Sequence, residues 1–139
     1  MTEQRMIAVG DTASLTRTFT EEDVRQFAEL SGDYNPVHLD AEFAAASQFG
    51  QRIVHGILVT SLFSTLLGTE LPGKGAIYMT QNSQFRAPVN LDEEVTATVE
   101  VLEINEKKPV VTLKTTATNA TGKVVIQGEA MMFVPWLKK

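Results

Sequence analysis

A carboxylate and an imidazole lie five positions apart in the segment Ser31-Gly32-Asp33-Tyr34-Asn35-Pro36-Val37-His38, which holds one of only two histidines among the 139 residues. Such a pair can move protons between water and a substrate when the two groups meet. In a helix, residues five apart would point about 140° away from each other. Asn35 precedes a proline and is therefore biased toward extended geometry. We interpret the segment as a tight turn that brings Asp33 and His38 to one point. The alternative is a polar turn in which His38 caps a helix or is exposed.

The composition sets limits on the function. A chain of 139 residues with 43% hydrophobic and 21% charged residues is expected to form one domain, residues 1–139. The net charge of −5 and the pI of about 5.0 argue against nucleic acid as the main partner. The chain has no cysteine and two histidines, so neither thiolate chemistry, a structural zinc site, another metal nor a cofactor is expected.

Targeting signals are not expected either. The first five residues lack the basic and apolar regions of a signal peptide. The longest apolar-rich stretch, residues 57–67, is interrupted by four hydroxyl side chains and is too short to span a membrane. We therefore expect a cytoplasmic protein without a membrane partner.

The proposed turn begins where a helix ends. Thr20 can cap that helix, with Asp23 three positions later and acidic residues in the first turn. Apolar residues follow at helical spacing, namely Val24, Phe27, Ala28 and Leu30. Gly32 occupies the position of a helix C-cap. The helix end therefore fixes where the turn points.

The rest of the chain supplies a sheet and a central helix. We expect a short strand within residues 6–19 and a short helix over 41–47 that Asp40 can cap. Residues 57–68 predict a helix that is apolar on nearly every side and therefore buried. Strands are expected at 76–87, 94–104, 110–119 and 123–134, the last three joined by short turns as an antiparallel meander. The predicted class is α+β, an antiparallel sheet wrapped around a central apolar helix.

The run Gly32-Asp33-Tyr34-Asn35-Pro36-Val37-His38 resembles the signature of the (R)-specific enoyl-CoA hydratases, also called hydratase 2 or MaoC-like dehydratases, which have the hot dog fold. Two further stretches agree with that family: Ile53-Val54-His55-Gly56, which leads into the apolar helix, and residues 71–78. The resemblance covers roughly residues 8–134, and the chain does not depart from the family pattern at the positions that matter for activity. It implies hydration of trans-2-enoyl-CoA to (R)-3-hydroxyacyl-CoA, most closely as in short bacterial enzymes that supply polyhydroxyalkanoate synthesis from β-oxidation.

The resemblance also implies roles for single residues. Asp33 and His38 activate water and protonate C2, although a coupled pair leaves the acid and base unassigned. Gly56 begins the apolar helix, where free N–H groups can hold an oxyanion; alternatively, it serves only the turn. Ser64 lies beside the dyad and orients it, or its hydroxyl merely bonds its own helix. Asn35 and Pro36 shape the turn.

For other residues, a functional role and an ordinary structural or solvent-exposed role are both possible interpretations. His55 is interpreted as structural, packed or hydrogen-bonded at the helix start, with catalysis as the less favoured option. An acyl tunnel could be lined by Met131, Met132 and Phe133, which are equally compatible with ordinary core. The CoA phosphates could be bound by Lys74, Lys107 and Lys108, although solvated lysines are the plainer reading.

A homodimer with one continuous sheet is expected from the resemblance and from the exposed sheet edge of a single hot dog domain. Two other functions are compatible with the fold. One is an acyl-CoA thioesterase, although such thioesterases lack the Asp33…His38 turn. The other is a non-catalytic acyl-binding module. The acyl length, the choice between CoA and acyl-carrier protein, and the physiological direction are left open by the sequence.

Overall fold

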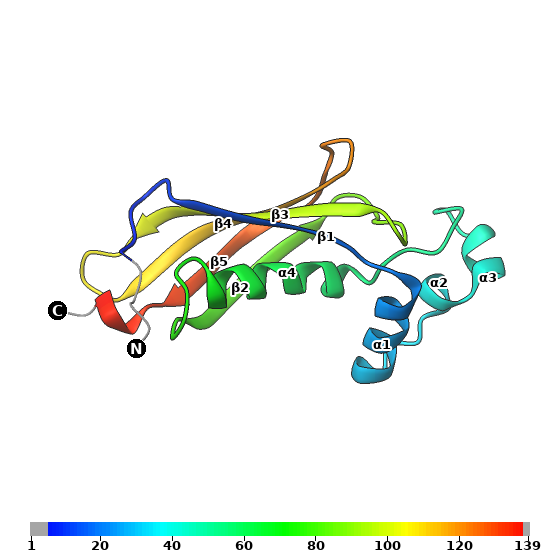
Figure 1. Ribbon diagram of the computed structural model, residues 1–139, viewed down its shortest axis with the longest axis horizontal. Helices are drawn as coiled ribbons and strands as arrows, with labels where there is room; N and C mark the ends of the chain where they lie inside the picture. The colour runs from blue at the N-terminus through cyan, green and yellow to red at the C-terminus, as the bar shows by residue number, and fades with distance from the viewer. Residues whose placement is uncertain (1–5, 138–139) are drawn as a thin grey trace.

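A five-stranded antiparallel sheet forms the body of the protein in the computed structural model, which describes residues 6–137. The strands lie in the order β1-β3-β4-β5-β2, so β1 and β2 form the two edges. Helix α4 runs along one face of the sheet, and the helices α1 to α3 gather beyond its N-terminal end (Figure 1). The elements are β1 Thr12–Thr18, α1 Glu21–Ser31, α2 Pro36–Leu39, α3 Ala41–Ala45, α4 Gly56–Thr69, β2 Ile77–Phe85, β3 Glu94–Ile104, β4 Val110–Asn119, β5 Val124–Phe133 and a 3₁₀ turn at Pro135–Leu137.

The core lies between α4 and the inner face of the sheet. Alternate residues of β3 and β4 are buried, as the period of two along a strand requires. They pack against the buried stripe of α4, formed by Val59, Leu62, Phe63, Leu66 and Leu67. Fully burying one such side chain stabilises the fold by about 1.5–3 kcal/mol. The predicted sheet around a central helix is therefore confirmed.

One face of α4 departs from the prediction. Ile57, Ser61 and Ser64 are exposed, so one face of α4 is open to solvent in the single chain. Residues three and four positions apart share a helix face, and this spacing brings the two serines onto the same face as Ile57. The hydroxyls of Thr60, Ser61 and Thr65 bond back to carbonyl oxygens of the same helix. They therefore place polar groups along this face without needing other partners.

The ends of α1 form as the sequence predicts. Thr20 accepts the N–H of Asp23, and the Asp23 carboxylate accepts the N–H of Thr20, which together make a capping box. Gly32 ends the helix with a φ of 81°, a left-handed conformation that glycine adopts without strain. The chain therefore leaves α1 in a fixed direction.

The segment after Gly32 differs in part from the predicted tight turn. Residues 32–35 do turn, but Pro36–Leu39 form the single helical turn α2. Proline at the first helical position fits this geometry, because its φ is already helical and its missing N–H needs no acceptor there. Asn35 caps α2 by accepting the N–H of Val37 at 3.2 Å, as expected of a residue that shapes the turn. His38 therefore projects from a helical turn.

Two element boundaries differ from the prediction. The first strand begins only at Thr12, and the short helix predicted over residues 41–47 ends at Ala45. Asp40 caps that helix through the N–H groups of Glu42 and Phe43, as predicted.

In the part of the chain that the structure describes, no helix has the length and apolar character needed to cross a membrane.

Candidate active site

Asp33, His38 and His55 meet beside the N-terminus of α4. One carboxylate oxygen of Asp33 and one ring nitrogen from each histidine all lie within 4.8 Å of one another. Asp33 is exposed, whereas His38 and His55 are only 8% and 2% exposed. The structure thus brings the acid and the imidazole together, as the sequence analysis expected, while their catalytic roles stay a prediction.

The ring of His38 has a defined protonation pattern. Its Nδ1 lies 2.8 Å from the carbonyl oxygen of Ile53. A carbonyl oxygen only accepts, so Nδ1 carries the proton and Nε2 of the neutral ring is the acceptor. Burial lowers the pKa of His38; the neighbouring His55 acts in the same direction, while the Ile53 carbonyl and Asp33 oppose it. Lowering the pKa favours the neutral ring, whose Nε2 lone pair can accept a proton from water.

The carboxylate of Asp33 is held by its own turn. Its Oδ1 accepts the backbone N–H of Asn35 at 3.2 Å, and its backbone N–H donates to the Ser31 hydroxyl at 3.1 Å. His55 donates its Nε2 hydrogen to the Asp33 carbonyl oxygen at 3.1 Å. The backbone of Asp33 is therefore fixed from α1 on one side and from the start of α4 on the other.

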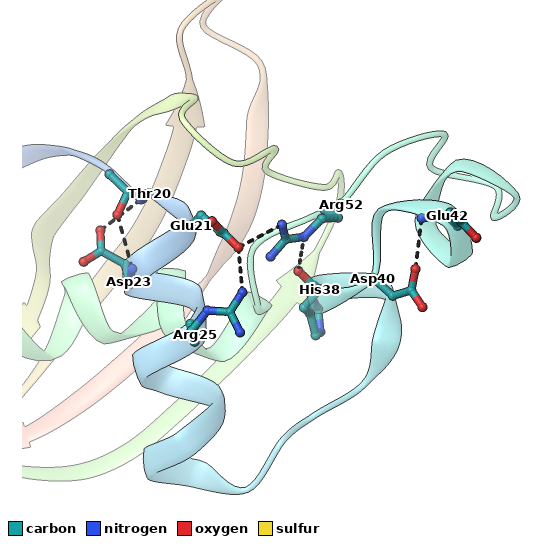
Figure 2. A network of polar contacts seen from close by, with 8 residues as sticks. All are labelled: Thr20, Glu21, Asp23, Arg25, His38, Asp40, Glu42 and Arg52. Atoms are coloured by element: carbon teal, nitrogen blue, oxygen red, sulfur yellow. Dashed lines mark hydrogen bonds and ion pairs between the residues drawn. The ribbon is translucent and has the colours of Figure 1, made fainter.

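Arg52 joins the helix that carries His38 to α1. Its Nε donates to the carbonyl oxygen of His38 at 2.7 Å, and its Nη1 lies 3.3 Å from Glu21. Figure 2 shows this guanidinium between the two helices, with Glu21 also paired to Arg25 at 2.7 Å. Hydrogen bonds from Arg25 and then Arg52 lower the pKa of Glu21, which keeps this carboxylate charged. Sequence reasoning missed Arg52, because no local spacing links it to a glutamate 31 positions earlier.

Gly56 is the first residue of α4. Its N–H has no acceptor among residues 6–137, because the first N–H groups of a helix lack an intrahelical partner and His55 adds no side-chain cap. A Cβ at this position would lie 2.6 Å from Cε1 of Phe85. Close packing against Phe85, rather than a turn that needs glycine, therefore explains this residue sterically. The free N–H and the positive end of the helix dipole are available to a negatively charged oxygen.

An apolar cavity of about 510 Å³ reaches Gly56. Its walls come from the segment before α4, from the first turn of α4 and from the end of β2, including Phe49, Ile53, Ile57 and Phe85. A pocket of this size and character can enclose a small acyl group or part of a larger apolar ligand. The helix N-terminus therefore has both a polar donor and an apolar space beside it.

The sequence of residues 7–124 matches the family model described as the MaoC like domain. The chain belongs to the MaoC-like family. It is 47% identical over 129 residues to the (R)-specific enoyl-CoA hydratase of Aeromonas caviae, covering 93% of this chain and 96% of that protein. The corresponding enzyme of Rhodospirillum rubrum is 48% identical, with 93% of this chain and 89% of that protein covered.

Solved structures confirm the hot dog fold of this MaoC-like domain. The (R)-hydratase from A. caviae involved in PHA biosynthesis superposes with a TM-score of 0.91 at 47% identity, covering 93% of this chain and 98% of that one. The R-hydratase PhaJ1 from Pseudomonas aeruginosa gives a TM-score of 0.87 at 42% identity, covering 96% and 84% of the two chains. The predicted family and fold are therefore both established.

Ser64 lies apart from the dyad in the single MaoC-like chain. It follows Gly56 by eight residues, which is about 12 Å along the helix axis. It lines a separate groove of about 320 Å³ with Tyr78, Met79 and other residues of α4 and β2. In the described part of the chain its hydroxyl makes no hydrogen bond, so the expected bond within its own helix is also absent.

The three residues proposed for an acyl tunnel divide between two faces of β5. Met132 points toward the core and is 1% exposed. Met131 and Phe133 lie on the outer face, because successive strand residues alternate, so they cannot line a space beside α4. Only Met132 stays compatible with a tunnel.

The three candidate lysines are exposed and lie far from the dyad in this chain. Lys74 follows the C-terminal end of the 14-residue α4, about 20 Å from its N-terminal end. Lys107 and Lys108 occupy the turn between β3 and β4, at that same far end (Figure 1). Among residues 6–137 none of them forms an ion pair, so the structure favours the solvated reading.

The second histidine is both packed and hydrogen-bonded at the start of α4, as its structural interpretation predicted. The rings of His38 and His55 are stacked, with centroids 3.8 Å apart and planes at 28°. His38 Nδ1 and His55 Nε2 each donate a hydrogen to a backbone carbonyl oxygen, so neither of these nitrogens offers a lone pair to a metal ion. The group fits a proton-transfer site better than a metal centre. In the sequence, His55 was marked as the second histidine and as part of the family-like stretch Ile53-Val54-His55-Gly56.

Proposed function

We propose that this MaoC-like chain is an (R)-specific enoyl-CoA hydratase, a hydro-lyase that adds water to trans-2-enoyl-CoA. One observation carries the proposal. The carboxylate of Asp33 and the imidazole of His38 converge within 4.8 Å beside the free N-terminus of α4. The identity of 47–48% to (R)-specific enoyl-CoA hydratases over 93% of the chain supports the same activity.

The reaction needs a site that handles both protons of one water molecule. The water oxygen bonds to C3 while the C2–C3 double bond breaks, and C2 gains a proton. The Asp33 carboxylate and the Nε2 lone pair of His38 are both acceptors, so they can hold the two hydrogens of the water. One of the pair accepts a proton from that water, and a proton returns to C2 from the same side. The hydroxyl and the proton are thus added to the same face, and the orientation in which the enoyl group binds selects the (R)-alcohol.

The thioester oxygen becomes negatively charged as the enolate develops. In the proposed mechanism the N–H of Gly56 donates to this oxygen, helped by the dipole of α4. Glycine allows the oxygen to approach the backbone closely. Loss of one such donor typically lowers the rate by about 10²- to 10³-fold. The apolar cavity beside Gly56 would then hold part of the acyl-CoA.

A homodimer is part of the proposal. The edge strand β2 has exposed apolar side chains, and the exposed face of α4 lies next to it in the groove that contains Ser64. An unpaired apolar edge is a template for strand pairing, so a second copy can extend the sheet there and cover this face. Ser64 would then lie at the interface, where it could contribute to a site shared by two chains.

The proposed role is to supply (R)-3-hydroxyacyl-CoA in the cytoplasm for polyhydroxyalkanoate or fatty-acid metabolism. The structurally similar A. caviae hydratase is described as involved in PHA biosynthesis, which supports the first of these routes. A chain-length series of trans-2-enoyl-CoAs, with chiral analysis of the product, would define the substrate range and test the (R) configuration.

Crotonyl-CoA separates the proposed activity from its alternatives. Loss of the conjugated enoyl absorbance without release of free thiol supports hydration. Free CoA would instead indicate a thioesterase, and binding without turnover would indicate an acyl-binding module. The variants Asp33→Asn and His38→Gln should each lower the rate by about 10²- to 10⁴-fold, the range typical of general acid–base groups. Wild-type rates in both variants would remove the basis for the dyad.

A further inference from the structure

We infer that His55 is a positioning residue that fixes both members of the catalytic pair at once, holding Asp33 through its backbone and His38 through ring stacking. The inference rests on the proposed hydratase function. It assigns to the second histidine a role in the reaction that is distinct from proton transfer.

The first contact ties down the turn that carries Asp33. Within residues 6–137, the hydrogen bond from His55 Nε2 to the Asp33 carbonyl oxygen spans 22 positions. The other hydrogen bonds of residues 32–35 reach at most four positions along the chain, to Ala28, Ser31, Val37 and His38. Such local bonds shape a turn but leave it free to move as a body. His55 therefore anchors the carboxylate-bearing turn to the rigid start of α4.

The second contact fixes the ring of His38. Stacking of the two imidazoles, with centroids 3.8 Å apart, limits movement of His38 perpendicular to its ring. The bond from Nδ1 to the Ile53 carbonyl limits rotation within the ring plane. Together they restrict the direction in which Nε2 points.

The ring of His55 is itself held in place. Phe27 of α1 packs its edge against it, with ring centroids 4.7 Å apart and planes at 63°. His55 thus lies between an aromatic residue of α1 and the histidine of α2, and it immediately precedes Gly56. One side chain consequently links the acid, the imidazole and the free helix N-terminus.

The surroundings of His55 argue against a role in proton transfer. Its Nε2 hydrogen is committed to a backbone carbonyl, which cannot take up a proton in the reaction. Its Nδ1 is buried and has no partner among the described residues. Neither nitrogen is therefore open to a substrate or to the bulk solvent, and the contribution of the ring is geometric.

Two substitutions separate the contacts. His55→Phe keeps an aromatic ring between Phe27 and His38 but removes the hydrogen bond to Asp33. His55→Gln keeps an N–H donor near the position of Nε2 but removes the ring. Val99→Ala is the matched control, because Val99 is fully buried in β3 and its loss should lower Tm without changing either contact.

Steady-state hydration of crotonyl-CoA gives the first readout. We expect His55→Phe to lower kcat by about 10- to 100-fold with KM and Tm near the wild-type values, because small displacements of reacting groups are costly. His55→Gln should recover part of that loss, and Val99→Ala should keep the wild-type kcat at a lower Tm. A wild-type kcat in His55→Phe would overturn the inference, and so would a loss of kcat that only follows Tm.

Amide hydrogen exchange gives a readout that does not depend on activity. In His55→Phe, we expect the Asn35 amide, which bonds only the Asp33 carboxylate, to exchange about 10-fold faster or more, with core amides of α4 unchanged. Unchanged exchange would show that His55 does not anchor the turn. If the wild-type protein itself fails to hydrate enoyl-CoA, the proposed function fails, and the exchange result still decides whether His55 holds Asp33.

Discussion

Arg52 donates its Nε hydrogen to the carbonyl oxygen of His38 at 2.7 Å, so the helical turn that carries the imidazole is held by a charged side chain from the opposite segment. The same guanidinium reaches Glu21 at the first residue of α1 (Figure 2). The orientation of His38 therefore depends on a contact between two helices as well as on its own short helix.

Arg52→Met should disturb that contact without touching the dyad. A hydrogen bond from a charged group to a partly buried acceptor contributes about 1.5–3 kcal/mol, so we expect a loss of that order in the free energy of unfolding. The rate of crotonyl-CoA hydration should also fall, because His38 would lose one of its supports. Urea denaturation and steady-state kinetics measure the two effects. Arg25→Met breaks only the exposed pair with Glu21 and should change neither quantity appreciably.

The pH dependence of kcat/KM should reflect the titration of His38. Burial holds the pKa of this imidazole below its usual value near 6.5, and the proposed mechanism needs its neutral form. We therefore expect kcat/KM to fall as the pH drops through that lowered pKa, with the midpoint of the fall below pH 6.5. A pH–rate profile with its acid limb above pH 6.5 would contradict this.

The free energy of unfolding should also depend on the protonation of His38. The unfolded chain binds a proton to His38 at a higher pH than the folded chain does, because the folded pKa is the lower one. The stabilisation is therefore complete above pH 6.5 and decreases as the pH falls through the folded pKa. His38→Gln removes this contribution, so the difference in unfolding free energy between wild type and variant should shrink over that pH range.

The fold could be predicted from the sequence to the extent that local rules decide it. The capping box at Thr20, the C-cap at Gly32 and the alternating valines of β3 each depend on residues within a few positions. The convergence of Asp33 and His38 was also predictable, because Pro36 and the helix end restrict the same short segment. The one-turn helix α2 was missed, since proline was taken to disfavour a helix although it fits the first position of one.

The remaining parts of the site depend on contacts between distant segments. Stacking of His55 on His38, the bond from Arg52 to α2 and the packing of Phe85 on Gly56 join elements 14 to 29 positions apart. No sequence periodicity encodes such pairs. The two faces of β5 were also misjudged, because three consecutive residues were assigned to one tunnel although strand residues alternate.

Gly56→Ala should affect substrate binding through Phe85. The new Cβ would lie 2.6 Å from the Phe85 ring, and that ring is half exposed, so it can swing away at a modest cost of about 1 kcal/mol. Its displacement would change the wall of the 510 Å³ cavity, so we expect KM for crotonyl-CoA to rise and kcat to fall. Phe85→Leu is the matched background. Adding Gly56→Ala to Phe85→Leu should cost little further stability, as thermal unfolding can show.

Met79→Lys tests the proposed homodimer at the free edge of β2. Met79 is 50% exposed at an irregularity in the pairing of β2 with β5, and it lines the groove that contains Ser64. A lysine on an edge strand opposes pairing with a second copy, because its charge would have to be desolvated. We expect sedimentation to show a shift from dimer to monomer at micromolar concentration, together with lower hydratase activity. Leu102→Lys makes the same change in charge at an exposed position of β3, which is not an edge strand, and should leave the dimer intact. A monomeric wild-type protein with full activity would contradict the proposed dimer and place the complete site within one chain.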